Sequence, residues 1–400
     1  MRYGVFTMQN MKKFISKGGH SMTVKKFNTP TVSSKIGICG LPLRVDTYSL
    51  CSFGCTYCFA NNREIMKSSD FKVANLNHLR KTLERILDRH EIDENSLSDK
   101  LISEGVTWHC GGLCDPFMPC EEKYHITSQM IDICNKYGIS ILFSTKGNSV
   151  YGADIRPDLH SFQLSISNIS DNKQWEPNVP SMESRYRFYR ELKSKGFKVG
   201  IRIQPFIPGV TDTDIIDLFH DADFFTIESV KIVPQDKEYR QKLTELLNIP
   251  ISDFKFSGLY NLKSELKLKY YKPFIENLEL YNIPFSIADN DLRSISKSKC
   301  CCGDVLIKKS TDFNTTALLK KYGSDYSLQN VYDEIGCYGD CSCKSLFASN
   351  RQKDVITVSD FFKSNINSTK NPAGKPFQYI PENDSFYKGY IHTNPESILQ

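Results

Sequence analysis

The chain has 400 residues, a formal net charge of +5 and 24% charged residues, and its 14 cysteines are clustered rather than spread along it. Cysteines in this number and grouping exclude a small disulfide scaffold and predict a reducing, cytoplasmic setting. No apolar run approaches the ~20 residues that span a membrane, and no secretory leader is visible, so we expect no membrane partner. The mild positive charge permits an anionic partner such as nucleic acid.

Strands and helices are predicted to alternate through the middle of the chain. In chain order we expect an extended run at 41–49, a helix at 76–87, strands at 106–110, 139–143, 162–166, 198–203 and 224–232, and helices at 124–136, 182–195 and 215–219. Strands separated by helices indicate parallel βαβ units. The fold class is therefore α/β, a partial or complete (β/α) barrel of the triosephosphate-isomerase type, whose sites lie on the loops after the strands.

Composition divides the chain into four parts. We expect a partly disordered N-terminal extension at 1–34, a barrel domain at 35–290 and a cysteine-rich region at 291–349. Residues 350–400 are rich in Asn, Ser, Lys and Pro, which predicts an irregular C-terminal tail.

Cys51, Cys55 and Cys58 form a C-x3-C-x2-C motif. Three thiolates within eight residues can hold three irons of a 4Fe-4S cube on one short loop, and the fourth iron is then left without a protein ligand. An open iron is a place where a substrate or cofactor binds. Zinc is the alternative, but structural zinc sites usually have four protein ligands.

The motif, with an aromatic residue just before its last cysteine, resembles the signature of radical S-adenosylmethionine enzymes. The stretches LRVDTYS at 43–49, YCFA at 57–60, DPF at 115–117, STK at 144–146 and RIQPFIPG at 202–209 are similar to the DNA-repair-photolyase-like branch related to spore photoproduct lyase. The resemblance covers roughly residues 40–235.

The resemblance implies a mechanism. S-adenosylmethionine would chelate the open iron, and an electron from a donor such as flavodoxin or ferredoxin would cleave it to a 5′-deoxyadenosyl radical that abstracts a substrate hydrogen. The branch implies nucleic acid or a nucleotide as substrate. Two alternatives stay open: modification of a peptide or small metabolite with the help of an auxiliary Fe-S cluster, and a non-catalytic Fe-S or zinc protein that binds nucleic acid.

The resemblance also implies cofactor-binding positions. These are Tyr57, Phe59, Gly111, Gly112, Asp115, Lys146, Ser165, Ser167, Arg202 and Gln204. Tyr57 and Phe59 match positions beside the adenine, and the two glycines match those that free backbone groups for the methionine amino group. Leu113 stands where the family has an acidic residue, which leaves Asp115 as a possible substitute.

Six of these positions have structural alternatives. Gly111 and Gly112 could form an ordinary turn. Ser165 and Ser167 resemble ribose or carboxylate contacts, but serines also cap a following segment. Lys146 and Arg202 would bind a carboxylate or a substrate phosphate at the same rim, although single charges are more often surface or structural groups.

A second set of cysteines comprises Cys300, Cys301 and Cys302, followed by Cys337, Cys341 and Cys343. An auxiliary Fe-S cluster or a zinc ion needs about four thiolates. The candidate ligands of this second site are Cys300, Cys302, Cys337, Cys341 and Cys343. Alternatively one thiol donates a hydrogen atom near the substrate, or the cysteines are small buried apolar residues.

Basic and aromatic residues interleave at 263–274. This pattern fits a nucleic-acid contact, where cations meet phosphates and aromatic rings stack on bases. It is more typical of a solvated helix face with buried tyrosines, because runs of charge usually face solvent.

Overall fold

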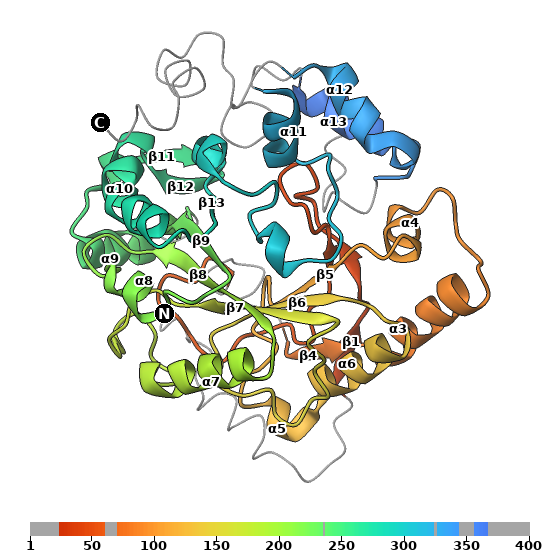
Figure 1. Ribbon diagram of the computed structural model, residues 1–400, viewed down its shortest axis with the longest axis horizontal. Coiled ribbons are helices and arrows are strands. Elements are labelled where there is room, and N and C mark those ends of the chain that lie inside the picture. Colours follow the sequence, from red (N-terminus) through yellow and green to blue (C-terminus); the bar gives the residue numbers. More distant parts are fainter. Residues whose placement is uncertain (1–23, 61–69, 235–236, 324–325, 344–355, 367–400) are drawn as a thin grey trace.

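A computed structural model describes residues 24–60, 70–234, 237–323, 326–343 and 356–366 (Figure 1). Its centre is an eight-stranded sheet in the order β13-β9-β8-β7-β6-β5-β3-β2. The strands are β13 (Phe285–Ile287), β9 (Phe224–Ser229), β8 (Lys198–Phe206), β7 (His160–Ser165), β6 (Ile141–Thr145), β5 (Trp108–Cys110), β3 (Leu43–Arg44) and β2 (Thr31–Val32). All neighbouring pairs are parallel except β2 and β3.

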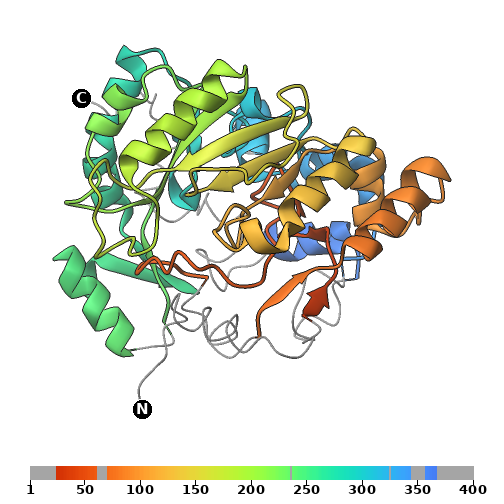
Figure 2. The ribbon, with the colours of Figure 1, turned by 90° about the horizontal axis from the view of Figure 1, so that it is seen from below.

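The two outer strands of this sheet, β13 and β2, pair with no strand beyond themselves in the described residues, so the sheet stays open as a partial barrel. The α/β class is confirmed, in its partial rather than its closed form. Figure 2 shows the sheet curving with helices along one side. Parallel strands are covered by their crossover helices, which explains this layering.

Helices cover the outer face of the sheet. They are α3 (Leu76–Leu83), α4 (Leu97–Ser103), α6 (Ile126–Lys136), α7 (Met182–Ser194), α8 (Asp214–Leu218) and α10 (Ser264–Leu280). Because strand side chains alternate, Ile201 and Ile203 of β8 join the core under the helices, while Arg202 and Gln204 lie on the opposite face. We call that opposite face the inner face; it carries most of the polar residues of the sheet.

The structure shifts some predicted boundaries. The helix at 76–87 is α3 followed by a π-helical turn, η1 (Glu84–Asp88). The helix at 124–136 begins later, because His125 adopts φ 49° between α5 (Glu121–Tyr124) and α6. The strand at 224–232 divides into β9 and β10 (Lys231–Ile232), and β10 joins a separate sheet.

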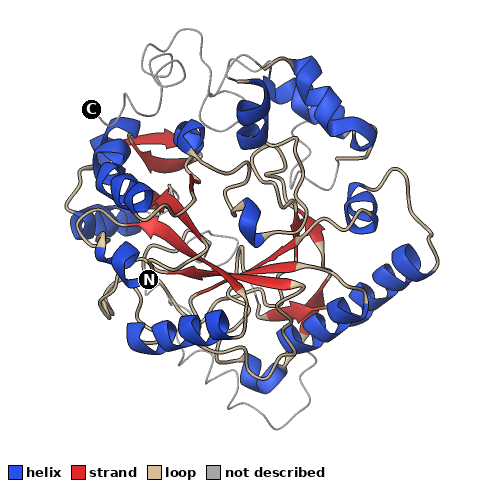
Figure 3. Cartoon of the chain, in the orientation of Figure 1, coloured by secondary structure: helices blue, strands red, loops and turns tan. Residues whose placement is uncertain are grey.

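Smaller elements complete the described chain. They are β1 (Lys25–Phe27), β4 (Lys72–Ala74), α9 (Lys237–Leu247), η2 (Ile251–Asp253), β11 (Phe254–Ser257), β12 (Leu259–Leu262), η3 (Asn290–Ile295), η4 (Asp304–Leu306), α11 (Thr315–Tyr322), α12 (Leu328–Ile335), η5 (Gly336–Tyr338) and α13 (Val358–Ile366). Figure 3 shows α11, α12 and α13 grouped at one corner of the molecule. None of the helices in the described ranges has both the length and the apolar character that a membrane crossing requires.

The structure describes only some of the residues in the four expected parts of the chain. Residues 1–23 of the N-terminal extension, and 344–355 and 367–400 of the two C-terminal parts, lie outside the described residues. Residues 24–34 include β1 and β2, and the expected irregular tail contains α13. The buried Phe362 of that helix packs edge-on against Phe313 at 5.8 Å, which gives the helix an apolar surface to cover.

The segment around η4 fills the inner face of the sheet. The Ser161 hydroxyl donates to the Leu306 carbonyl, and a Cβ added at Gly200 would lie 2.6 Å from Leu306. Gly200 therefore makes room for this segment, which lies on the concave side of the sheet (Figure 1). The cysteines just before it contact the inner face, because the Cys301 and Cys302 carbonyls accept from Thr226 and Gln163.

Gly111, directly after β5, accepts no side chain. Its φ is +98°, and an added Cβ would lie 2.0 Å from the Ser144 carbonyl oxygen. Gly138 has φ +64° but open space around it. We therefore predict that Gly138→Ala costs about 1–2 kcal/mol of unfolding free energy, from backbone strain alone.

Gly111→Ala adds a backbone clash to that strain and should cost about 3 kcal/mol or more. Urea denaturation of both variants, followed by circular dichroism, measures the difference. Equal costs for the two variants would show that β5 and β6 can separate without penalty.

Candidate functional site

The cysteine loop at 51–58 docks against the segment that follows β7. The Thr56 amide donates to the Trp175 carbonyl at 2.9 Å, and the Asn178 amide donates to the Phe53 carbonyl at 3.3 Å. The carboxyl ends of parallel strands share one edge of a sheet, and sites in such folds form there. The predicted cluster loop is thus held at this edge by backbone hydrogen bonds.

The three loop thiols lie in one environment. Cys55 is buried, and Cys51 and Cys58 are half-buried against the same apolar cluster. Contact with the Cys114 thiol lowers the pKa of Cys51, whereas burial, and then the charge of Glu176, raises that of Cys55. Cys51 and Cys58 also act electrostatically on Cys55, so the thiols face a shared region.

The loop thiols are spaced more widely than ligands of one ion. In the described part of the chain, the triad whose ligand atoms all lie within 4.8 Å of one another is formed by other cysteines. A single tetrahedral zinc ion holds thiolates closer, about 3.8 Å apart for bonds of about 2.3 Å. A cube places each thiolate on a separate iron, so the donor set fits a cluster better than one ion.

Lys146, at the end of β6, lies beside the cysteine loop. Its Nζ is 2.9 Å from a Glu176 carboxylate oxygen, 3.3 Å from the Ser167 hydroxyl and 5.6 Å from the centre of the Tyr57 ring. The Tyr57 hydroxyl donates to the same carboxylate and lies 3.2 Å from Ser167. The structure thus brings together three of the predicted residues: Tyr57, Lys146 and Ser167.

Glu176 is the centre of this group, which we call the Glu176 network, and Arg185 of α7 completes it. The Arg185 guanidinium lies 3.5 Å from the carboxylate and also donates to the Ser165 carbonyl. Burial works to raise the pKa of Glu176, but the charges of Lys146 and Arg185 outweigh it and bring the pKa to about 2. The carboxylate is therefore ionised at neutral pH.

Sequence reasoning missed both Glu176 and Arg185. Arg185 had a signal: it occupies the buried face of α7 together with Met182, Phe188 and Leu192, where an apolar residue is expected. A charge on that face indicates a buried partner. Glu176 lies in an irregular segment, so no periodicity marks it.

The glycine pair has a packing role at its first position. The Ser144 carbonyl occupies the space of a side chain at Gly111, as described above. A Cβ at Gly112 would make only ordinary contact, 3.7 Å from the Arg44 guanidinium. Leu113 is exposed, and its amide donates to Asp46.

Asp115 is committed to protein contacts. Its carboxylate accepts from the Thr145 hydroxyl at 2.7 Å, the Lys146 amide at 2.6 Å and the Phe117 amide at 3.0 Å. Burial nevertheless raises its pKa. Asp115 therefore ties the loop after β5 to the end of β6, and this role competes with the predicted contact to a methionine amino group.

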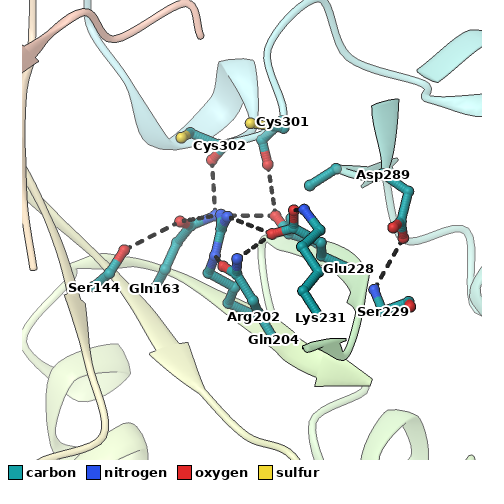
Figure 4. A network of polar contacts seen from close by, with 12 residues as sticks. Ser144, Gln163, Arg202, Gln204, Glu228, Ser229, Lys231, Asp289, Cys301 and Cys302 are labelled. Atoms are coloured by element: carbon teal, nitrogen blue, oxygen red, sulfur yellow. Dashed lines mark hydrogen bonds and ion pairs between the residues drawn. The ribbon is translucent and has the colours of Figure 1, made fainter. Parts of the chain in front are cut away.

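Arg202 and Gln204 lie deeper, on the inner face (Figure 4). Arg202 donates to Gln163 at 3.2 Å and to Gln204, and its guanidinium is 3.9 Å from Glu228. Gln204 also donates to Glu228, which pairs with Lys231. Lys146 contacts Tyr57 of the cysteine loop, whereas Arg202 contacts Gln163, Gln204 and Glu228. The two cations that were predicted to share a rim therefore have different partners.

The remaining predicted positions contribute less. Ser165 offers its carbonyl to Lys146 and Arg185, rather than a described hydroxyl contact. Phe59 is half-buried next to the last cysteine of the motif. The segment 263–274 is not a solvated basic face throughout, because Lys267 and Tyr271 are buried on Asp289.

Two buried donors at this edge lack a protein acceptor. Asn168 Nδ2, directly after Ser167, and Nε of Arg44, in β3, have no hydrogen-bond partner. Buried polar groups are normally paired, and an unpaired one indicates an unobserved ligand or water. Together with the thiols, these donors fit a polar cofactor at the carboxyl edge.

The two groups of C-terminal cysteines lie apart. Cys300 and Cys302 pack on the inner face of the sheet. Cys341 and Cys343, together with Val358, belong to the apolar core that also contains the outward-facing strand residues and the helices. Cys337 is exposed. A joint metal site of these five residues would need the two groups to approach each other.

One curated protein bears on the family. The radical SAM Nalpha-GlyT isomerase of Pseudomonas phage M6 is 25% identical to this chain over 175 residues, which are 42% of this chain and 34% of that protein. The chain resembles the radical S-adenosylmethionine enzymes. The expected resemblance is thereby confirmed, although the match spans only about a third of the length of the curated relative. No family model matches the chain.

Solved structures are similar at a lower level. Spore photoproduct lyase complexed with dinucleoside spore photoproduct has 14% identity and a TM-score of 0.47, covering 68% of this chain and 91% of that one. SuiB of Streptococcus suis bound to S-adenosylmethionine has 15% identity and a TM-score of 0.35, covering 60% and 52%. Both values are too low to transfer a substrate or an activity.

The pKa of Glu176 predicts a pH-dependent stability. Because its pKa is lowered in the folded state, the carboxylate stabilises the fold above its unfolded pKa of 4.5 and loses this effect as the pH falls toward 2. Between pH 5.5 and 3, wild type should lose about 2 kcal/mol more unfolding free energy than Glu176→Gln. Urea titrations at several pH values measure this difference.

Glu183→Gln is the matched control, since Glu183 lies on α7 with a side chain that is 83% exposed. It should follow wild type at every pH. Parallel curves for wild type and Glu176→Gln would contradict the ionised, buried carboxylate.

Proposed function

We propose that this chain is a radical S-adenosylmethionine enzyme. One observation carries the proposal: a C-x3-C-x2-C loop is held at the carboxyl edge of a partial barrel, beside the buried Glu176 network. The similarity to a radical SAM isomerase supports it. A structural zinc site would require neither the C-x3-C-x2-C spacing of the cysteines nor a place at the carboxyl edge of the sheet.

Cys51, Cys55 and Cys58 would hold the 4Fe-4S cluster, and Tyr57, Ser167 and Asn168 offer polar groups to S-adenosylmethionine. When bound, the cluster and the cofactor supply one-electron chemistry that generates a 5′-deoxyadenosyl radical for hydrogen abstraction. The Nδ2 of Asn168 is buried without a hydrogen-bond partner, so it is a donor that the cofactor would satisfy.

The protein positions these groups and excludes water. The charge-assisted contacts of Glu176 fix the Tyr57 side chain beside Lys146. Burial, and then the charges of Cys55 and Glu176, raises the pKa of Tyr57, so its hydroxyl keeps its proton and acts as a donor. A dry, rigid wall of this kind protects a reactive intermediate from side reactions.

We further propose that the substrate is nucleic acid or a nucleotide. The formal net charge of +5 favours an anionic substrate. The sequence stretches that resemble the DNA-repair-photolyase-like branch point the same way. An electron donor such as flavodoxin or ferredoxin is part of this proposal.

Anaerobic reconstitution tests the cofactor chemistry. The wild-type chain should bind about four irons at the loop and release 5′-deoxyadenosine when given dithionite and S-adenosylmethionine. Cys55→Ala should lose most of this iron and all release. Cys134→Ala should retain both, because Cys134 is a buried thiol in α6. Retention of the iron by Cys55→Ala would contradict the proposed enzyme function. A reconstituted cluster that does not cleave S-adenosylmethionine would contradict it too.

Salt dependence tests the substrate class. Binding to a single-stranded oligonucleotide should weaken linearly in log Kd against log salt, because each phosphate contact releases counterions, with a slope of about 0.7 per contact. Fluorescence anisotropy measures it, with an uncharged peptide of similar size as the control ligand. Salt-independent binding, or preference for the peptide, would favour peptide or metabolite modification instead.

A further inference from the structure

Three consecutive cysteines converge on the inner face of the sheet. The ligand atoms of Cys300, Cys301 and Cys302 all lie within 4.8 Å of one another, and all three residues are buried. On an extended strand, neighbouring side chains point to opposite faces, so three adjacent thiols cannot meet there. Here the chain turns: the Gly303 amide donates to the Cys300 carbonyl at 3.0 Å, with Gly303 at φ +85°.

The sheet holds the backbone of this turn and leaves the thiols free to face one another. The Thr226 hydroxyl donates to the Cys301 carbonyl at 2.7 Å, and the Gln163 amide group donates to the Cys302 carbonyl at 3.2 Å. In Figure 4 these carbonyls face the polar network, while the sulfur atoms of Cys301 and Cys302 lie on the other side. The hydrogen bonds from Thr226 and Gln163 therefore fix the backbone conformation that brings the three thiols together.

A fourth thiol approaches from a distant part of the sequence. Cys39 packs against the apolar cluster that contains the three cysteines, and it acts electrostatically on Cys301. A Cβ added at Gly40 would lie 2.9 Å from Cys300 Sγ, so the chain at 39–40 passes directly over that thiol. The Thr311 amide fixes this passage by donating to the Gly40 carbonyl at 2.9 Å.

The surroundings are positively charged and lack a matching carboxylate. Arg293 is only 5% exposed, and its described partners are neutral: the Ala288 carbonyl at 3.2 Å, the Asn290 side chain at 3.1 Å and the Thr316 hydroxyl at 3.1 Å. No described carboxylate forms an ion pair with it. A buried charge is costly unless a counter-charge is near, so an anionic group is expected here.

Arg202 adds to this excess. It is buried, and Glu228, its carboxylate partner at 3.9 Å, is closer to Lys231. Arg202 and Arg293 both act electrostatically on Cys301, and Arg44 acts on Cys39. Thiolates are the anions that these guanidinium groups can stabilise, and a set of mutually close thiolates is stable only around a cation.

We propose that Cys300, Cys301 and Cys302, with Cys39 as the fourth thiol, bind a thiophilic divalent metal ion such as Zn2+. Tetrahedral zinc holds thiolate sulfurs about 3.8 Å apart, so the spacing of the triad needs only small side-chain rotations to close on one ion. Four thiolates and Zn2+ leave two negative charges, which the three surrounding guanidinium groups offset. This site excludes Cys337, Cys341 and Cys343, and none of its four thiols belongs to the cysteine loop.

Metal analysis tests the proposal without reference to radical chemistry. The full chain carrying Cys51→Ala, Cys55→Ala and Cys58→Ala serves as the background, because its loop can bind no metal. After dialysis against Zn2+ and removal of free ion, this background should retain about one zinc per chain. Added Cys301→Ser should abolish retention, and Cys39→Ser should weaken zinc binding by about tenfold or more. Added Cys134→Ser should change nothing.

Cobalt provides a second readout that needs no further substitution. Co2+ bound to the background should show thiolate-to-metal charge-transfer absorption and the ligand-field bands of tetrahedral coordination, and Zn2+ should displace it. Circular dichroism and melting curves establish that Cys301→Ser is folded. Absence of metal from the background, retention in Cys301→Ser, iron with sulfide in place of zinc, or a disulfide within the triad would each overturn the proposal.

Discussion

The Glu176 carboxylate joins the parts of the site that the fold brings from separate elements. It meets Tyr57 of the cysteine loop, Lys146 after β6 and Arg185 of α7, and it is buried among them. A buried carboxylate is stable only if its charge is matched and its oxygens are bonded, so these partners cannot move independently. The position of the cysteine loop therefore depends on this one ion-pair network as well as on backbone contacts.

A second consequence concerns the inner face of the sheet. The partial barrel is open, and the segment around η4 enters it and brings three thiols close to Arg202 and Arg293. Polar strand residues such as Gln163 and Thr226 donate hydrogen bonds to the backbone carbonyls of that segment. The interior is thus divided between the proposed cofactor edge, near Lys146, and a deeper cluster of thiols and cations.

The cysteine loop and the alternation of strands and helices could be predicted from sequence, because both rest on local spacing. Lys146 and Ser167 could be placed at one edge, since strand ends in a parallel sheet share an edge. Glu176 could not be found, because nothing local distinguishes an acidic residue in an irregular segment.

Contacts that join distant segments were equally out of reach. Asp115 was expected to face a cofactor, yet its carboxylate oxygens accept hydrogen bonds from the Thr145 hydroxyl and the Lys146 amide. The approach of Cys39 to Cys300 depends on how two segments far apart in the sequence pack together, which no local pattern records.

The central claim is that S-adenosylmethionine binds directly to the cluster on the cysteine loop. Electron paramagnetic resonance of the reduced, reconstituted full chain tests it most directly. Addition of S-adenosylmethionine should change the g values of the cluster signal, because the open iron gains amino and carboxylate ligands, and Cys134→Ala should behave like wild type. A cluster signal that is unchanged by saturating S-adenosylmethionine would contradict the account.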